Sequence, residues 1–371
     1  SGNITTFAGS GISGSTDGQG LSASFNNPYG IVFDQADNLY VVDNLNRIIR
    51  KIDPSGYVST FAGNGTASLI DGQGTDASFN NPTNIAIDSS GNLYVSEYGS
   101  SSIRKITPDA NVTTFAGTGS RGSNNGQGTS ASFDRPYGLV FDSSSNLYVG
   151  DYGNHVIRKI DPSGNVTTFA GMMDSSGFSD GQGTSASFYG PVGLTIDPHG
   201  KLYVTDQLNH SIRMIDPSGK VTTIAGTGSE GSADGIGDQS SFNVPYGILS
   251  DENGNLLVAD LVNHTIRKIN LVGDRVNFRV DFADGAGNSG SVDNTTDNSL
   301  VKVDLEIPVI LNDNITSTNQ DPNWAKYGDN IPLSFSTSEP IQDPTDNISI
   351  DGLTDIVVLG SENKTEWTAT G

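Results

Sequence analysis

Short apolar runs alternate with polar turns along residues 1–270, and the order of the runs repeats. In the third copy the apolar runs read PYGLVF, LYVGD, VIRKI and NVTTFA, and the polar segments between them read DSSSN, YGNH and DPSG. Runs of this kind, rich in Val, Ile, Tyr and Phe and bounded by Gly, Asn, Asp and Pro, are typical of β-strands. Each copy therefore predicts four short strands, which we call a, b, c and d in chain order.

A phenylalanine in an Ala-Ser-Phe or Ser-Ser-Phe triplet marks the same point in every copy. These phenylalanines are Phe25, Phe79, Phe133, Phe188 and Phe242. Consecutive ones are 54 or 55 residues apart, and four strands per copy at such a period predict the blades of a β-propeller. One sheet cannot bury both of its faces alone, whereas blades stacked in a ring do so. We expect each phenylalanine to lie as a wedge between adjacent blades.

Three motifs in these copies resemble the NHL-repeat family of propellers. They are Pro-x-Gly-Ile/Leu before strand a, Gly-Asn-Leu-Tyr-Val-x-Asp in strand b and Asn-His-x-Ile-Arg-Lys-Ile in strand c, best seen at 146–160 and 201–215. The resemblance covers about residues 1–270 and implies a propeller fold. NHL propellers commonly have six blades, so the five copies found here depart from the family pattern.

The d strands are offset from the other strands of the repeat. The first d-like run, residues 3–7, precedes every a strand, and the last c strand, residues 265–269, has no d-like run after it. The sequence therefore predicts an all-β fold with a five-bladed, NHL-like propeller over residues 1–270, closed when the N-terminal strand 3–7 pairs with 265–269. Such pairing would remove the open edges of the ring.

The period disappears after Asn270, and the rest of the chain resembles bacterial Ig-like domains of large secreted surface proteins. The motifs that carry this resemblance are Pro308-Val-Ile, Ala325-Lys-Tyr-Gly-Asp-Asn-Ile-Pro-Leu-Ser-Phe, Ser338-Glu-Pro-Ile and Trp367-Thr-Ala-Thr. Residues 271–306 predict two strands, the terminal hairpin of an Ig-like sandwich, and residues 307–371 predict an incomplete Ig-like β-sandwich. In that family the hairpin follows the Trp strand, whereas here it comes first.

This order has two interpretations. In one, the hairpin and the later strands belong to different sandwiches, each completed by a neighbouring copy through strand addition in a fibre-like array. In the other, the chain is a piece of a larger protein. The first interpretation makes copies of the chain its own partners.

Charge and composition exclude several classes of function. The net charge is −23, with 19 Lys and Arg against 42 Asp and Glu. Nucleic acids and anionic membranes bind basic surfaces, so neither is expected as a partner. Cysteine is absent, which removes disulfides, thiol catalysis and zinc–thiolate sites. No apolar run approaches the roughly 20 residues that cross a bilayer.

Charged residues recur at fixed points of the repeat. Each c strand carries an arginine: Arg50, Arg104, Arg158, Arg213 and Arg267. Each b strand ends in an acid: Asp43, Glu97, Asp151, Asp206 and Asp260. We expect structural ion pairs, because a catalytic residue is usually an exception to a repeat. His155, His210 and His264 also share one position, and structural packing at the blade rim is favoured there over a ring of metal ligands.

Two sets of oxygen-bearing side chains are candidate Ca²⁺ ligands, since Ca²⁺ prefers oxygen. The first lies in the Asp-Gly-Gln-Gly loops: Asp17, Asp71, Asn125, Asp180 and Asp234. Turn formation by these side chains explains that pattern equally well. The second and denser set is Asp281, Asp284 and Asn288. No other cofactor is predicted.

The favoured function is that of an extracellular or cell-surface structural or adhesive protein, with the role of a filament subunit as one form of it. A propeller that binds a glycan or a protein is the alternative, with Tyr29, Tyr137 and Tyr246 at its mouth, although packing against a neighbouring blade explains these rings equally well. A metal-dependent propeller lyase or lactonase is less favoured. The chain is predicted not to be an enzyme, because no isolated, non-repeating Glu or His constellation is visible.

Overall fold

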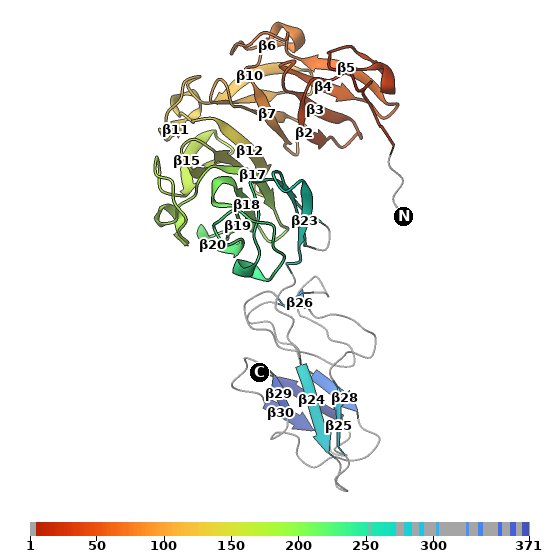
Figure 1. Cartoon of the computed structure of the whole chain (residues 1–371), viewed down its shortest axis with the longest axis vertical. Coiled ribbons are helices and arrows are strands. Elements are labelled where there is room, and N and C mark those ends of the chain that lie inside the picture. Colours follow the sequence, from red (N-terminus) through yellow and green to blue (C-terminus); the bar gives the residue numbers. More distant parts are fainter. Residues whose placement is uncertain are drawn as a thin grey trace. The chain divides into compact units, whose positions relative to one another are not determined.

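The computed structural model describes residues 5–251 and 254–271, and beyond them the backbone of short strands between residues 278 and 370. The chain divides into two compact units, Ser1–Ile269 and Asn270–Gly371. Figure 1 shows the chain with its strands labelled.

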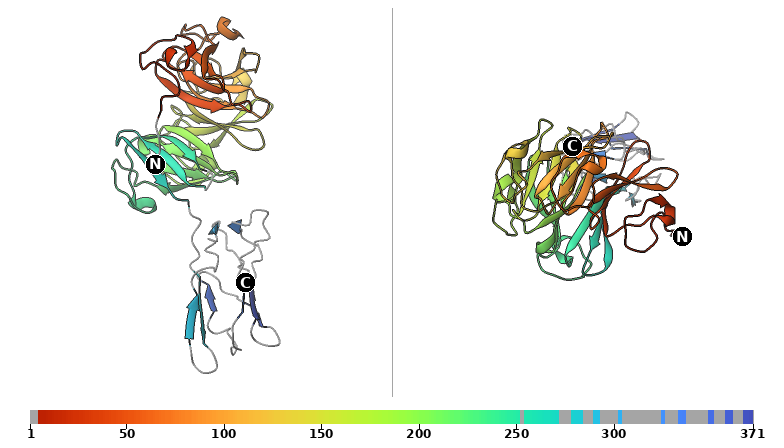
Figure 2. Two further views of the ribbon diagram at one scale, coloured as in Figure 1. Left: turned by 90° about the vertical axis from the view of Figure 1, so that its right-hand side faces the viewer. Right: turned by 90° about the horizontal axis from the view of Figure 1, so that it is seen from above.

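The first unit contains five antiparallel sheets that follow one another around an arc, as Figures 1 and 2 show. The first sheet has the order β1 (Gly18–Gln19), β5 (Tyr57–Ala62), β4 (Ile48–Ile52), β3 (Leu39–Asp43) and β2 (Pro28–Phe33). The second has β6 (Gly72–Gln73), β10 (Asn111–Ala116), β9 (Ser102–Ile106), β8 (Leu93–Glu97) and β7 (Pro82–Ile87). The third has β11 (Gly126–Gln127), β15 (Asn165–Ala170), β14 (Val156–Ile160), β13 (Leu147–Asp151) and β12 (Pro136–Phe141). The fourth has β16 (Gly181–Gln182), β20 (Lys220–Ala225), β19 (Ser211–Ile215), β18 (Leu202–Asp206) and β17 (Pro191–Ile196).

The fifth sheet has three strands, β21 (Pro245–Ser250), β22 (Leu256–Asp260) and β23 (Thr265–Ile269). The prediction of an all-β, five-bladed propeller is confirmed. Strands a to d of the repeat are, in the first blade, β2, β3, β4 and β5. The sequence pattern did not predict the two-residue strands such as β1, which pair with the outer edge of strand d. Short 3₁₀ helices connect the elements: η1 (Gly20–Ser22), η2 (Gly74–Asp76), η3 (Gly128–Ser130), η4 (Gly183–Ser185), η5 (Gln207–Asn209) and η6 (Gly237–Gln239).

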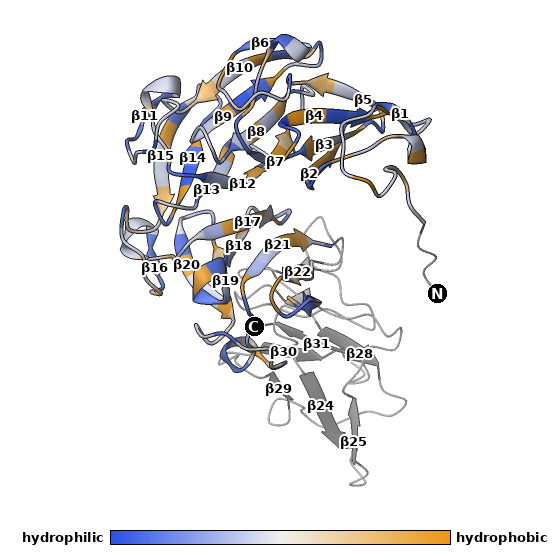
Figure 3. Ribbon diagram, turned by 45° about the horizontal axis from the view of Figure 1, so that its top comes forward, coloured by the Kyte–Doolittle hydropathy of each residue, from blue (hydrophilic) through white to orange (hydrophobic). Residues whose placement is uncertain are grey.

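The core lies between successive blades, and Figure 3 shows apolar residues along their strands. Phe79 is fully buried and belongs to one cluster with Val42 and Ile49 of the first blade and with Leu93 and Val95 of the second. The predicted wedge is therefore confirmed. A ring buried among two blades removes apolar area from water on both sides, and this burial is the main force that stacks the sheets.

The innermost strands approach one another very closely, which explains the glycine in the Pro-x-Gly motif. A Cβ atom on Gly138 of β12 would lie 2.1 Å from the carbonyl oxygen of Val192 in β17. A Cβ atom on Gly193 would lie 2.3 Å from the carbonyl oxygen of Tyr246 in β21. Only glycine allows this backbone contact near the axis of the ring.

The predicted pairing of residues 3–7 with residues 265–269 is not present in the part of the chain that the structure describes. Thr5–Phe7 lie outside any strand, and β23 has one described neighbour, β22. In the other blades strand d follows strand c through a tight turn, where Asp161 Oδ1 accepts a hydrogen bond from the Ser163 amide. The N-terminal segment has no such turn, and its pairing must span the whole ring, at a larger cost in loop-closure entropy.

The second unit contains β24 (Phe278–Ala283), β25 (Ser289–Val292), β26 (Lys302–Val303), β27 (Trp324–Ala325), β28 (Leu333–Ser336), β29 (Ile348–Ile350), β30 (Val357–Gly360) and β31 (Glu366–Thr370). Strand β24 pairs with β25 and with β29, and β31 pairs with β28 and β30. The sequence pattern assigned β24 and β29 to different sandwiches, and the pairing places them in one sheet. The Ig-like class of this unit stays a prediction.

Candidate functional site

Three tyrosines at the start of strand a come together at one end of the propeller. Tyr29, Tyr137 and Tyr246 occupy the same position in β2, β12 and β21. The rings of Tyr137 and Tyr246 meet edge to face, with centroids 5.4 Å apart, and their hydroxyl groups are hydrogen-bonded. Burial raises the pKa of Tyr246, and the charge of Tyr29 and a hydrogen bond with it raise this pKa further. The three residues predicted from the sequence therefore do gather around the axis.

A second row of aromatic side chains joins this group from the loops after strand b. Antiparallel pairing places the end of strand b beside the start of strand a. Tyr98 follows β8, and its ring centroid lies 6.4 Å from that of Tyr137. Tyr152 follows β13, and burial raises its pKa, with the nearby charge of Tyr98 adding to the effect.

Arg135 lies between these two loops. Its guanidinium carbon is 5.9 Å from the ring centroid of Tyr98 and 5.7 Å from that of Tyr152. Contacts of this length are cation–π interactions. Its Nε and Nη2 atoms donate to the two carboxylate oxygens of Asp134 at 3.0 and 3.3 Å. Hydrogen bonds to Asp134 and Tyr98 raise the pKa of Arg135, so it stays a cation paired with an anion.

The backbone at Arg135 adopts a conformation that a long side chain rarely takes. Its φ is +57°, in the left-handed region. The equivalent residue before the proline in the other blades also has positive φ, and it is Asn27, Asn81, Gly190 or Val244. Arg135 is therefore the single charged residue at this position of the repeat.

A histidine and a glycine complete the arrangement in the next blade. The Nδ1 atom of His155 accepts a hydrogen bond from the Gly190 amide at 3.2 Å, and its ring centroid lies 5.3 Å from that of Tyr189. A Cβ atom on Gly190 would lie 2.8 Å from the ring of Tyr152, so glycine makes room for this tyrosine. Burial lowers the pKa of His155, and the charge of Arg135 lowers it further.

The repeated histidines thus connect blades. His210 accepts from the Val244 amide at 3.2 Å through Nδ1, as His155 does from Gly190. A structural role was predicted for this position, and for His155 and His210 it is confirmed. The bonds run to the residue before strand a of the next blade.

We call the seven residues together the aromatic face: Tyr29, Tyr98, Arg135, Tyr137, Tyr152, Tyr189 and Tyr246. Tyr29 is 43% exposed and Tyr189 is 40% exposed, so rings at the face are accessible to a ligand. Asp134 pairs with Arg135 and also with Arg121 Nε, at 3.3 Å. The tyrosine rings beside this cluster offer apolar surfaces fringed by hydroxyl groups. Tyr98, Arg135, Tyr152 and Tyr189 were not predicted from the sequence. Arg135 and Tyr189 break the repeat, and Tyr98 and Tyr152 share the position after strand b in two blades, so both signals could have identified them.

The repeated arginines and acids form the predicted ion pairs. The Arg–acid distances in the five blades are 3.2, 3.4, 2.8, 2.7 and 3.0 Å in chain order. Each guanidinium also lies 5.0–5.2 Å from the phenylalanine wedge of its own blade. Arg158 and Asp151 have no exposed side-chain surface. These residues hold each blade together, and they do not line the aromatic face.

Side chains of the Asp-Gly-Gln-Gly loops form hydrogen bonds with the same arginines. Asp17 Oδ1 accepts from Arg50 Nη2 at 2.8 Å and from the Thr60 hydroxyl at 3.1 Å. Asn125 takes the place of the aspartate in the third blade and accepts from Arg158. These side chains therefore act as hydrogen-bond acceptors within each blade, which accounts for their repetition without a metal ion.

The other predicted metal site lies outside the described residues. Asp284 and Asn288 are not described, and Asp281 is described only as backbone of β24. Among the residues that the structure does describe, no three His, Cys, Asp or Glu side chains gather as a metal site would require. Ca²⁺ at Asp281, Asp284 and Asn288 stays a prediction.

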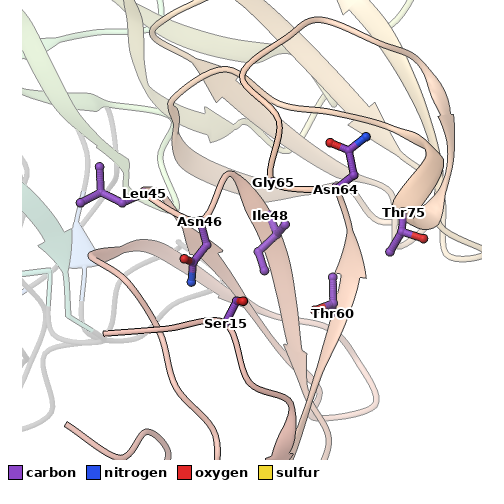
Figure 4. Close-up of a pocket in the computed structure, with 9 residues that line it drawn as sticks. Ser15, Leu45, Asn46, Ile48, Thr60, Asn64, Gly65 and Thr75 are labelled. Carbon is purple, nitrogen blue, oxygen red and sulfur yellow. The ribbon is translucent and has the colours of Figure 1, made fainter. Parts of the chain in front are cut away.

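A pocket of about 570 Å³ lies on the first blade, and no residue of the aromatic face lines it (Figure 4). It is lined by Ser15, Leu45, Asn46, Ile48, Thr60, Gly63, Asn64, Gly65 and Thr75. No ionisable side chain is among them, so this pocket offers no acid, base or cation for chemistry.

Comparison with known proteins supports the NHL resemblance. The chain is 32% identical over 286 residues to the chloroplastic Protein SUPPRESSOR OF QUENCHING 1 of Arabidopsis thaliana, covering 72% of this chain and 27% of the relative. It is 32% identical over 296 residues to NHL repeat-containing protein 2 of Bos taurus, covering 70% of this chain and 41% of the relative. The chain therefore has NHL-repeat homologues, and it spans less than half the length of these curated relatives.

The chain is also similar to solved structures. An auxiliary nutrient binding protein from Bacteroides ovatus is 23% identical, with a TM-score of 0.47, over 71% of this chain and 75% of that one. No family model matches the sequence. Within the described residues, no helix has the length and apolar character needed to cross a membrane.

Proposed function

We propose that the propeller is a binding module and that the aromatic face binds a neutral glycan. The observation that carries this proposal is the meeting of Tyr29, Tyr137 and Tyr246 at the axis, with one ring left 43% exposed. Tyrosine offers a flat apolar surface and a hydroxyl group at little cost in conformational entropy. A sugar ring presents apolar C–H faces and hydroxyl groups, which match these two features.

The charges at the face favour a neutral ligand over an acidic one. Arg135 is the cation of the aromatic face, and its Nε and Nη2 atoms already donate to Asp134, which also pairs with Arg121. A second anion would have to displace this carboxylate or approach it. The net charge of −23 also repels anions at long range.

The wider role follows from the same proposal. A glycan-binding propeller fits an extracellular or cell-surface protein with an adhesive role. In this proposal the aromatic face supplies adhesion and the chain is not an enzyme. The filament hypothesis, in which neighbouring copies complete each other, depends on residues 271–371 and is kept as a separate prediction.

The test compares two tyrosines of similar exposure. Purified full-length chain is applied to an array of neutral and acidic glycans, and the affinity of the best ligand is measured by titration calorimetry. The Tyr29→Ala variant removes a ring of the face, and the matched control Tyr57→Ala removes a ring that is 46% exposed on β5. An aromatic contact contributes roughly 0.5–1.5 kcal/mol beyond the area buried, so we expect up to about a tenfold loss of affinity for Tyr29→Ala alone.

Two results would contradict the proposal. One is an array with no neutral glycan bound, or with acidic glycans bound more tightly. The other is an equal loss of affinity in the Tyr29→Ala and Tyr57→Ala variants, which would show that the aromatic face does not contact the ligand.

A further inference from the structure

The pocket on the first blade is lined by a position whose size changes from blade to blade. Ser15 lines this pocket and lies ten residues before Phe25, the wedge of the first blade. Its counterparts in the second, third and fourth blades are Leu69, Ser123 and Phe178. A large apolar side chain thus alternates with a serine at this position, and a serine leaves more of the space open.

Where the side chain at this position is large, it packs against a glycine in the loop that follows strand d. In the fourth blade, a Cβ atom on Gly228 would lie 2.7 Å from the ring of Phe178. In the second blade, a Cβ atom on Gly119 would lie 2.8 Å from the side chain of Leu69. Their counterpart in the first blade, Gly65, lines the pocket, and a Cβ atom there would have no side chain within 4 Å. The first blade therefore keeps the glycine without the side chain that packs against it.

The third blade bridges the same position with a hydrogen bond. The Ser123 hydroxyl donates to Asp174 Oδ2 at 3.0 Å, and Asp174 lies in the loop that follows strand d. This loop is one residue longer than its counterparts, since Phe133 and Phe188 are 55 residues apart and the other wedges are 54 apart. The first blade has neither the large side chain nor the longer loop, and the space there is the pocket of about 570 Å³.

The first blade supplies apolar surface to the pocket from strand c and from the turn before it. Ile48 begins β4 and lines the pocket, whereas its counterparts in the second and fourth blades are Ser102 and Ser211. Leu45 also lines the pocket and is 50% exposed. An engineered protein cavity of about 150 Å³ binds benzene, so a pocket of 570 Å³ has room for a substituted ring beside these side chains.

The polar groups of the lining favour a neutral ligand. Ser15, Asn64 and Thr75 bring hydroxyl and amide groups to the pocket, as Figure 4 shows. These groups form hydrogen bonds with a neutral polar substituent. No ionisable side chain lines the pocket to pair with a charged one, and the net charge of −23 repels anions.

From these features we infer that the pocket of the first blade binds a small neutral aromatic molecule. Its ring lies against Gly65 as the ring of Phe178 lies against Gly228 in the fourth blade. The ligand thus brings to the first blade a ring that the fourth blade carries in its own chain. This site is independent of the glycan site proposed above, because no residue of the aromatic face lines the pocket.

The test follows a fluorinated probe by ¹⁹F NMR in titrations of the full-length chain. The probe is 4-fluorobenzyl alcohol, a neutral ring with one hydroxyl group. The Ser15→Phe and Ser15→Leu variants copy the side chains of the fourth and second blades into the pocket. The matched control, Ser90→Phe, adds the same ring at an exposed serine in a turn of the second blade. Urea unfolding of each variant verifies that it is folded.

We expect the parent chain to bind the probe saturably with a Kd on the order of 1 mM, which is within reach of a ligand of this size. Both Ser15 variants should weaken binding at least about tenfold, and Ser90→Phe should change it by less than about twofold. The charged analogue 4-fluorobenzoate should bind the parent chain at least about tenfold more weakly than the alcohol.

Three results would overturn the inference. The first is the absence of saturable binding to the parent chain. The second is an unchanged affinity in a folded Ser15→Phe or Ser15→Leu variant, which would place the probe elsewhere on the protein. The third is equal binding of the benzoate and the alcohol, because a lining without ionisable side chains does not bind a carboxylate that well.

Discussion

Replacing Arg158 by leucine tests whether the repeated ion pairs hold the blades together. Arg158 Nη1 donates to Asp151 Oδ2 at 2.8 Å and to the Ser132 carbonyl at 2.9 Å, and the arginine and Asp151 side chains are both fully buried. Leucine leaves the carboxylate of Asp151 buried without its cation. Breaking a buried pair by removing one partner costs about 3–5 kcal/mol. We expect a loss of this size in the free energy of unfolding at pH 7.

The pH dependence of this loss identifies its cause. Burial raises the pKa of Asp151 to about 6, above the ordinary 3.8, although the charge of Arg158 lowers it. Protonation of Asp151 therefore stabilises the folded chain. This contribution is fully present below about pH 3.8, the pKa of an unfolded aspartate, and is lost as the pH rises through about 6. Without Arg158 the pKa rises further, so the deficit of the variant should shrink between pH 7 and pH 5.

Urea unfolding of the full chain, followed by tyrosine fluorescence, measures the loss. The control Arg121→Leu removes an exposed partner of Asp134, since Arg121 is 64% exposed, and should cost at most about 1 kcal/mol. Equal losses in the two variants, or a loss in Arg158→Leu that does not change with pH, would refute the assignment of a buried structural pair.

Two further predictions concern the site and the axis. The pKa of His155, followed by NMR, should lie below 6.5 and should rise in the Arg135→Gln variant, because burial and the charge of Arg135 both oppose protonation. The stability that neutral His155 contributes is present above pH 6.5 and is lost as the pH falls through the lowered pKa. An unchanged pKa of His155 in Arg135→Gln would contradict this interaction. Gly138→Ala should lower the free energy of unfolding by about 1–3 kcal/mol, because the added Cβ atom would lie 2.1 Å from the Val192 carbonyl oxygen. In a domain of this size, a loss of 1 kcal/mol lowers the melting temperature by about 2–4 °C. A melting temperature within about 1–2 °C of that of the parent chain would therefore contradict the close approach.

Repetition made the scaffold predictable from sequence. Phe79, Arg158 and Asp151 each have counterparts in the other blades, because every blade needs the same contact. A motif that occurs five times at a fixed spacing predicts a strand or a contact more reliably than a single occurrence does. The two-residue strand β1 was missed, since Gly-Gln has neither apolar periodicity nor β-branched residues. It forms because strand d offers an open edge, which is a tertiary feature.

The candidate site was only partly predictable. Tyr29, Tyr137 and Tyr246 share one position of the repeat, so propeller symmetry alone brings them to the axis. Contacts of Arg135 with Tyr98 and Tyr152 depend on two loops of different blades and on a positive φ before a proline. Residue spacing in the sequence does not predict these contacts of Arg135, because the packing of one blade on the next brings the two loops together.

Within the aromatic face, Arg135 and Tyr189 depart from the repeat, whereas the other tyrosines recur at two of its positions. A contact that stabilises the fold is needed in every blade. Departures from the repeat that serve no function should therefore be scattered among the blades and at both ends of the sheets. Arg135 instead contacts Tyr98 of the second blade and Tyr152 of its own, third blade. Arg135 has a positive φ, as the residue at this position has in every blade, Val244 included, and for a side chain of this kind that conformation costs of order 1–3 kcal/mol. Arg135 contacts rings from the second and third blades, and in the proposed function this surface is where a neutral glycan binds.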